Sequence, residues 1–276
     1  MRVRIVVGAA TDVGRVRDHN EDGYLVDDTL ALVAVADGMG GHRGGEVASA
    51  VALDALRTAF AASRGIHDAM AVANRAVCER AATDAGLRGM GTTLTAGALD
   101  DQATLVIGHV GDSRAYLVRD GELTRLTTDH SVVEELMAVG ELTEEEAGSD
   151  PRRSMITRAL GLEPVVDVDL YPVELRPLDR VLLCSDGLTA MLRGPAIAAV
   201  LADEPDADAA ARRLVDAANA AGGVDNTTAL VIDVLDDDGS ADRVTRAGIP
   251  STSDPSRRRR FRLGSRRRAD GASGQR

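Results

Sequence analysis

Short apolar runs rich in Val, Ile and Leu alternate with longer alanine-rich segments along most of the chain. Short runs of β-branched residues with turn-like flanks are typical of strands. We therefore expect strands over residues 4–10, 30–37, 92–99, 103–112, 114–120, 181–186 and 228–235. Helical spacing of apolar positions predicts helices over residues 45–62, 66–83, 131–139, 195–202 and 207–221.

The order of these elements favours an α+β fold. Two predicted helices follow one another over residues 45–83, and several strands then follow one another over residues 92–126. Asp120-Gly121 within YLVRDGELTRL is typical of a hairpin turn. Because a parallel doubly wound sheet would need strict alternation, we expect largely antiparallel sheets covered by helices. The polar residues 140–153 predict a loop or a short helical insertion at one edge.

Composition changes sharply near the C-terminus. We predict one globular domain over residues 1–235, whereas residues 236–276 lose the apolar pattern and hold eleven Arg against six Asp. We expect this basic tail to be disordered, with a regulatory or tethering role as an alternative to a solubilising one. The whole chain has a formal net charge of −12, so the first 235 residues are strongly acidic.

An acidic body argues against nucleic acid as the main partner and suits a site that collects cations. The sequence contains no Lys, which excludes phosphate-binding loops that depend on lysine. The two cysteines, Cys78 and Cys184, read as small buried hydrophobic residues. We see no signal peptide or transmembrane anchor, and we expect a cytoplasmic monomer.

Four aspartates share one local pattern, in which an acidic residue adjoins an apolar run and a glycine or small polar residue. They are Asp37 in VAVADG, Asp112 in IGHVGDS, Asp186 in LLCSDG and Asp225 in AGGVDN. We expect each to follow a buried strand, where an ionised carboxylate is costly unless it is paired or binds a metal. The alternative for any single one is an Asp that caps a turn.

Together the four aspartates predict a metal site. Carboxylates gathered at strand ends repel one another unless a divalent cation balances them. Oxygen ligands without a Cys or His cluster favour Mg²⁺ or Mn²⁺ over zinc. Near the N-terminus, GRVRDHNEDG adds Glu21 and Asp22, preceded by Arg15 and Arg17, and a guanidinium beside such a site suits a phosphate.

Eight motifs in order resemble the metal-dependent protein serine/threonine phosphatases of type 2C, in their bacterial form. The motifs are RVRDHNED, ADGMGGHRGGEVAS, MGTTLTA, HVGDSRAYL, DHS, RSMITRALG, LLCSDGLT and DNTTALVI, and they span nearly all of residues 8–235. The resemblance implies a four-layer α-β-β-α sandwich with two central, mainly antiparallel sheets and metals at one end.

The same resemblance implies a set of metal ligands. Asp37 is expected to bridge two Mn²⁺ or Mg²⁺ ions, and Gly38 to offer its backbone carbonyl to one of them. Asp186 and Asp225 are expected to complete the protein shell of the other ion. Each of these residues occupies the matching place in its motif.

The resemblance implies roles for four further residues. Glu21 matches an acidic residue that contacts the metal cluster through water, and Arg17 matches the arginine that binds the substrate phosphate. Asp112 matches the ligand of a third metal in bacterial members, with Ser154 as its neighbour. The implied reaction is direct attack on phosphorus by a water that the two ions activate, without a phosphoenzyme.

One motif departs from the eukaryotic pattern, in which a histidine is proposed to protonate the leaving alkoxide. No residue here matches that histidine; Met39 cannot donate a proton, and His42 reads as a loop residue. The sequence leaves the general acid unassigned, with a metal-bound water as one candidate.

Two other classes of protein are considered. An aspartyl-phosphate phosphatase of the haloacid dehalogenase type needs an assisting lysine and is excluded by the absence of Lys. A non-catalytic phosphoprotein-binding regulator on the same scaffold remains as the alternative, although all three core aspartates are present. The expected partners of an enzyme are phosphorylated Hanks-type serine/threonine kinases and their protein substrates, including those with forkhead-associated domains.

Overall fold

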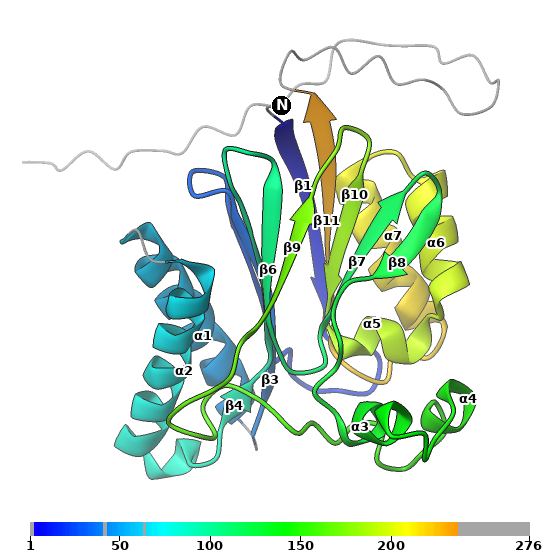
Figure 1. Ribbon diagram of the computed structural model, residues 1–276. Coiled ribbons are helices and arrows are strands. Elements are labelled where there is room, and N and C mark those ends of the chain that lie inside the picture. Colours follow the sequence, from blue (N-terminus) through cyan, green and yellow to red (C-terminus); the bar gives the residue numbers. More distant parts are fainter. Residues whose placement is uncertain (1–2, 41–42, 63–64, 237–276) are drawn as a thin grey trace, which may run out of the picture. The chain divides into compact units, whose positions relative to one another are not determined.

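Two antiparallel β-sheets lie face to face, and helices cover both outer faces (Figure 1). The structure is a computed structural model, and it describes residues 3–40, 43–62 and 65–236. Residues Met1–Ser240 form one compact unit. The four-layer α+β sandwich expected from the sequence is confirmed.

The first sheet has the strand order β2-β3-β5-β6-β9, with the short β4 paired to β3. The bounds are β2 (Asp22–Asp27), β3 (Leu32–Met39), β4 (Gly91–Thr92), β5 (Leu94–Leu99), β6 (Thr104–Val110) and β9 (Asp169–Glu174). The second sheet has the order β1-β11-β10-β7-β8. Its strands are β1 (Val3–Asp12), β7 (Arg114–Arg119), β8 (Glu122–Arg125), β10 (Arg180–Cys184) and β11 (Thr227–Asp236).

Side chains of the central strands alternate between two different cores. In β3, Leu32, Ala34 and Ala36 face the helices, whereas Val33 and Val35 face the second sheet. This follows from the two-residue period of a strand, and burial on both faces explains why the run is continuously apolar. Alanines on the helix side leave room for helices to approach the sheet closely.

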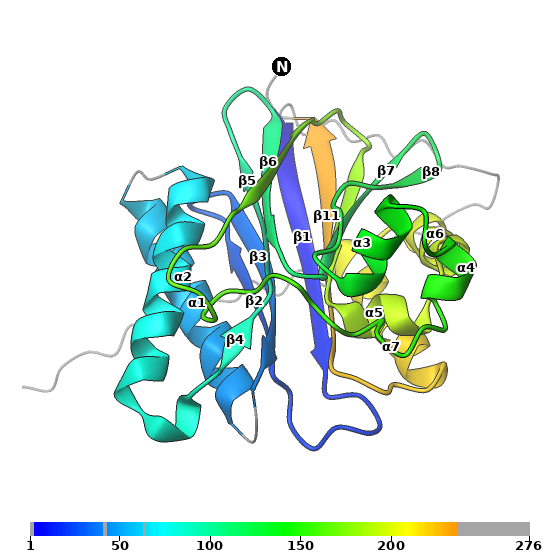
Figure 2. The ribbon, with the colours of Figure 1, turned by 60° about the horizontal axis from the view of Figure 1, so that its bottom comes forward.

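The helices fall into three groups. The first sheet is covered by α1 (Gly44–Ala61) and α2 (Ile66–Thr83), followed by the 3-10 turn η1 (Ala85–Leu87). The second sheet is covered by α5 (Asp186–Met191), α6 (Gly194–Asp203) and α7 (Ala207–Ala220). The short helices α3 (Val132–Ala138) and α4 (Glu144–Ala147) lie beside α5 at one end of the sandwich (Figure 2).

Most predicted elements are present, but strands β2 and β9, the 3-10 turn η1 and helix α5 were not predicted. The sequences of β2 (DGYLVD) and β9 (DLYPVE) show no regular alternation of polar and apolar residues, neither strand has a fully buried residue, and β9 contains Pro172. Proline is tolerated there because β9 is an edge strand. Helix α5 begins directly where the predicted strand 181–186 was expected to end. The insertion over residues 140–153 contains α4, as one of the two alternatives anticipated.

The predicted hairpin joins β7 to β8. Asp120 and Gly121 have φ angles of 54° and 84°, which is the left-handed geometry of a tight hairpin turn. Cys184 is fully buried as expected, whereas Cys78 is only half-buried on α2.

Two predictions fall largely outside the described residues. The tail was predicted from residue 236, but Asp236 is the last residue of β11, and residues 237–276 are not described. His42 also lies outside the described residues. Within the described part of the chain, no helix combines the length and apolarity needed to cross a bilayer.

Candidate active site

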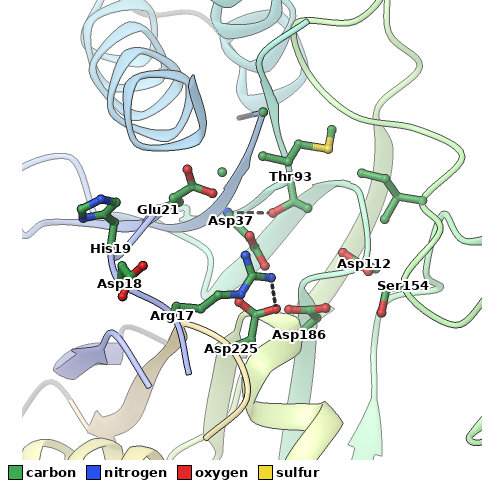
Figure 3. Close-up of a pocket in the computed structure, with 14 residues that line it drawn as sticks. Arg17, Asp18, His19, Glu21, Asp37, Thr93, Asp112, Ser154, Asp186 and Asp225 are labelled. Atoms are coloured by element: carbon green, nitrogen blue, oxygen red, sulfur yellow. Dashed lines mark hydrogen bonds and ion pairs between the residues drawn. The ribbon is translucent and has the colours of Figure 1, made fainter. Parts of the chain in front are cut away.

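A cavity of about 450 Å³ lies at the end of the sandwich where loops from both sheets meet (Figure 3). Its lining comes from segments distant in sequence, including the β1–β2 loop, the end of β3, the β6–β7 connection and the α7–β11 loop. All eight residues that the sequence analysis assigned to a site line this one cavity: Arg17, Glu21, Asp37, Gly38, Asp112, Ser154, Asp186 and Asp225.

Asp37 lies inside β3, two residues before its end, whereas the strand was expected to end at this residue. Its backbone N–H donates to Thr93 Oγ1 at 2.9 Å, and its carbonyl accepts from the Thr93 N–H at 2.9 Å. Thr92 Oγ1 donates to the same carbonyl at 2.9 Å. The Asp37 backbone is therefore held by the GTT segment, which was quoted as a motif but given no role from the sequence.

Gly38 is required by the close approach of two backbone segments. A Cβ at this position would lie 2.1 Å from the Gly45 carbonyl oxygen and 2.6 Å from that of Glu21. The Gly38 N–H also donates to the Glu21 carbonyl at 3.2 Å. The absence of a side chain thus lets β3, the start of α1 and the Glu21 segment meet beside Asp37.

The other three aspartates reach the cavity by different routes. Asp112 follows β6 after Gly111, in the connection that passes from one sheet to the other. Asp186 is the first residue of α5, two residues after β10. Asp225 lies between α7 and β11, so the expectation that it follows a strand is wrong. The apolar run next to Asp225 is the strand after it, and strand direction is not visible in a hydrophobic pattern.

Three carboxylates of the cluster resist ionisation in the metal-free protein. Burial raises the pKa of Asp37 and Asp112 well above the usual value, and the Asp186 carboxylate raises both further by repulsion. The pKa of Asp186 is itself raised, again mainly by burial. A cluster that disfavours its own negative charge is stabilised by a bound cation.

Asp22 is a further member of the acidic cluster, and no role was assigned to it from the sequence. It pairs with Asp37 across β2 and β3. Its Oδ2 accepts from Ser185 Oγ and Thr228 Oγ1, both at 2.7 Å, while its buried Oδ1 has no hydrogen-bond partner among the described residues. Burial raises the pKa of Asp22 to about 7. Only the pairing of β2 with β3 reveals that Asp22 lies beside Asp37.

Arg17 lies over the acidic cavity. Its guanidinium NH2 group donates to Asp225 Oδ2 at 2.7 Å, and half of its side chain is exposed (Figure 3). The Asp225, Asp37 and Glu21 carboxylates raise the pKa of Arg17, against the opposing and larger single effect of burial. The guanidinium is thus held near the rim with part of its surface open to the cavity.

Asn226 holds the β1–β2 loop against the site. Its Nδ2 donates to the carbonyls of Val13 and His19 at 2.9 and 2.8 Å, and its Oδ1 accepts from the Glu21 N–H at 2.8 Å. This residue stands next to Asp225 in the DNTT motif but received no role from the sequence. Its side chain explains how Arg17 and Glu21 reach a site made mostly by other elements.

The remaining lining residues include four that the sequence analysis did not select: Asp18, His19, Thr93 and Ile156. In Figure 3, Asp18 and His19 lie at the edge of the group, away from Asp112 and Asp186. Met39 also lines the cavity. Ser154 lies on the Asp112 side and is exposed.

The chemistry of the donors fits hard divalent cations. Carboxylate and carbonyl oxygens line the cavity, and its lining contains neither Cys nor a second His beside His19. Among the described residues, no three acidic, His or Cys side chains are placed so that they could hold one ion by themselves. Mg²⁺ and Mn²⁺ suit such a site because they are bound through a few carboxylates and retain several waters.

Comparison with known proteins decides the family. The family model described as protein phosphatase 2C matches residues 15–229. The chain belongs to the protein phosphatase 2C family. The resemblance drawn from the eight motifs is thereby confirmed.

Relatives in this family are similar over most of the chain. The serine/threonine phosphatase stp of Listeria monocytogenes is 40% identical over 236 residues, covering 81% of this chain and 93% of the relative. The serine/threonine protein phosphatase PstP of Mycobacterium tuberculosis is 41% identical over 262 residues, covering 92% of this chain and 50% of PstP.

A solved structure gives the same picture. The catalytic domain of PstP in complex with two manganese ions has a TM-score of 0.77 and 39% identity, covering 85% of this chain and all of that one. As a protein phosphatase 2C family member, this chain is a metal-dependent phosphoprotein phosphatase. Its cofactor is Mn²⁺ or Mg²⁺, with two core ions.

Proposed function

We propose that this chain hydrolyses phosphoserine and phosphothreonine in proteins by direct attack of water, with no covalent phosphoenzyme. The proposal is supported by one observation above all. Asp37, Asp112, Asp186 and Asp225 converge on one cavity, three of them with raised pKa values, and Arg17 lies over the same cavity. This arrangement provides negative charge for cations and one positive group for a phosphate.

We assign the metal ligands as follows. Asp37 would bind both core ions, the Gly38 carbonyl would bind one of them, and Asp186 with Asp225 would bind the other. Glu21 would contact the ions through a water, and Asp112 with Ser154 would hold a third ion. When bound, the ions would supply a water of lowered pKa and would neutralise charge on the phosphoryl group.

Arg17 has a positioning and binding role in this scheme. A guanidinium holds two phosphoryl oxygens with parallel hydrogen bonds, and its charge stabilises the oxygens as the ester bond breaks. The ion pair with Asp225 orients Arg17 before substrate arrives. The Asn226 hydrogen bonds fix the loop that carries it.

We further propose that the substrates are phosphorylated Hanks-type kinases and their protein substrates. We place the reaction in the cytoplasm, where ATP-dependent kinases make such phosphoproteins. We assign it to a single copy of the chain, since one chain supplies every proposed site residue.

Hydrolysis of a phosphothreonine peptide tests the function. We expect phosphate release by the full chain with Mn²⁺, and a fall of about a hundredfold in Asp186→Asn, because the proposed metal shell loses a charged ligand. Asp54→Asn, at an exposed position on α1, is the matched control and should keep full activity. Circular dichroism checks that both variants are folded.

Two outcomes would contradict the proposal. Equal release in excess chelator would exclude the two-metal mechanism. Binding of the phosphopeptide without metal-dependent release would favour the non-catalytic regulator.

A further inference from the structure

A second cavity of about 570 Å³ lies directly beside the candidate active site. The two cavities share Asp112, Ser154 and Asp186 as lining residues. The second is walled by residues of α3, α4 and α5 together with the segment before Ser154. A peptide whose phosphoresidue occupies the first cavity therefore has its neighbouring residues within reach of the second.

Four arginines line this second cavity, and two of them are paired. Arg114 donates to Asp129 at 2.7 Å, and Arg125 lies 2.6 Å from Asp129 and 3.3 Å from Glu134. These contacts are internal to the wall of the cavity. Arg114 and Arg125 thus have their charge balanced by the protein.

Arg153 and Arg193 are different. Both are exposed, and neither forms an ion pair with a residue in the described part of the chain. Arg193 precedes α6 and lies against α4: a Cβ on Gly148 would be 2.7 Å from its guanidinium NH2. Arg153 adjoins Ser154, which is shared with the active-site cavity.

The charge balance of this cavity favours an anionic occupant. Asp112 and Asp186 belong to the proposed metal site, and Asp129 and Glu134 are paired with arginines. Glu144 is then the one remaining acidic residue of the lining, against two unpaired guanidinium groups among the described residues. A guanidinium binds carboxylate or phosphate oxygens with two parallel hydrogen bonds.

We propose that this second cavity, through Arg153 and Arg193, binds an acidic group that flanks the phosphoresidue of the substrate. The ligand is a peptide segment carrying a carboxylate or a second phosphate. This inference rests on the proposed function, because it names the class of phosphoprotein segment that the same enzyme prefers.

Matched phosphothreonine peptides test the preference. Four peptides differ only next to the phosphothreonine, with neutral, Asp/Glu, phosphoserine or Arg flanks, and kcat/KM is measured with Mn²⁺ for each. We expect the acidic peptides to exceed the neutral one by about fivefold, mainly through KM, the effect of one or two exposed ion pairs. The Asp/Glu and phosphoserine arms distinguish the carboxylate from the phosphate source.

Charge reversal tests the residues. In the double variant Arg153→Glu/Arg193→Glu, the ratio of kcat/KM between acidic and neutral peptides should fall below one. Arg212→Glu, an exposed arginine of α7 outside both cavities, is the control and should keep the wild-type ratio. Because the ratio compares two peptides on one enzyme, a general loss of activity does not change it.

The possible failures are separable. Metal-dependent release from all peptides at equal rates, a preference for Arg flanks, or an acidic preference retained by the double variant would overturn this inference alone. Absence of metal-dependent release from every peptide would overturn the proposed function and this inference with it.

Discussion

At the active site the fold holds charged side chains close together, both of opposite and of like sign. Arg17 and Asp225 form an ion pair at 2.7 Å, whereas the two carboxylic acids Asp37 and Asp22 stand opposite one another on neighbouring strands. In each case the role of the side chain depends on its neighbours more than on its own chemistry. Substitutions that alter one charge while preserving shape are therefore the most informative at this scale.

Replacing Arg17 by Ala should lower kcat/KM for p-nitrophenyl phosphate by about tenfold or more, because a charge-assisted hydrogen bond to phosphate is worth about 1.5–3 kcal/mol. Steady-state kinetics with Mn²⁺ measures this. Arg15→Ala is the control, since Arg15 lies two residues away in the same loop but does not line the cavity. Equal losses in both variants would show a loop effect and contradict phosphate binding by Arg17.

Replacing Asp22 by Asn should change how stability depends on pH. The pKa of Asp22 is raised from 3.8 to about 7 in the folded protein, so as pH rises through this window the unfolded chain releases its proton first. The wild type then loses stability that the non-titrating Asn retains. Without metal, the difference in melting temperature, variant minus wild type, should increase from pH 4 to pH 8.

Thermal melts in chelator at several pH values measure this difference. Asp54→Asn should show a difference that does not vary with pH. A constant difference for Asp22→Asn as well would mean that Asp22 is ionised in the fold throughout this range.

At the scale of elements, the site is assembled from connections between the layers. The β6–β7 connection, which carries Asp112, passes from one sheet to the other. Two hydrogen bonds hold this connection. The backbone N–H of Gly111 donates to the ring Nδ1 of His130 at 2.9 Å, and the backbone N–H of His130 donates to the Gly111 carbonyl at 2.8 Å. The strands thus provide rigid ends, and short polar links set the directions of the loops.

Close packing of helices on strands depends on small residues at defined places. A Cβ on Gly8 of β1 would lie 2.1 Å from the Ala207 carbonyl carbon, at the start of α7. Gly8→Ala should therefore lower the free energy of unfolding by about 2 kcal/mol, the cost of overpacking. Urea denaturation of the metal-free protein measures it.

Gly194→Ala serves as the matched control for this prediction. Its nearest heavy atom to a new Cβ is 4.0 Å away, so the change should stay within about 0.5 kcal/mol. Similar losses at Gly8 and Gly194 would contradict a packing cause.

For the whole molecule, the acidic body and the site together predict metal-linked stability. At a Mn²⁺ concentration 100 times the dissociation constant, binding should add about 2.7 kcal/mol to stability. For a domain of this size the melting temperature should rise by roughly 5–10 °C. Differential scanning fluorimetry in chelator and in Mn²⁺ measures the shift.

Asp186→Asn should lose most of this stabilisation. Sodium chloride at matched ionic strength controls for general screening of the net charge of −12. An equal shift in the variant, or an equal shift in sodium chloride, would show that screening and not site binding is responsible.

The spacing of apolar residues was sufficient to predict many of the strands and helices. A strand or helix that packs against a core must place apolar residues at the period of its own backbone. The continuous apolar runs of β3, β10 and β11 and the spaced apolar positions of α7 illustrate this. Elements with a weak period, such as β2 and β9, could not be recognised, since their burial comes from partners elsewhere in the chain.

The sequence by itself determined the family, the acidic and oxygen-rich character of the site, and eight of the residues that line its cavity, because ordered motifs preserve the residues that chemistry requires. Tertiary structure alone decided that β3 continues beyond Asp37, that Asp225 precedes a strand, and that Asp22 and Asn226 support the site. It also decided that Arg153 and Arg193 share one cavity. The reason is physical: strand direction, sheet pairing and charge balance depend on contacts between residues far apart in the chain.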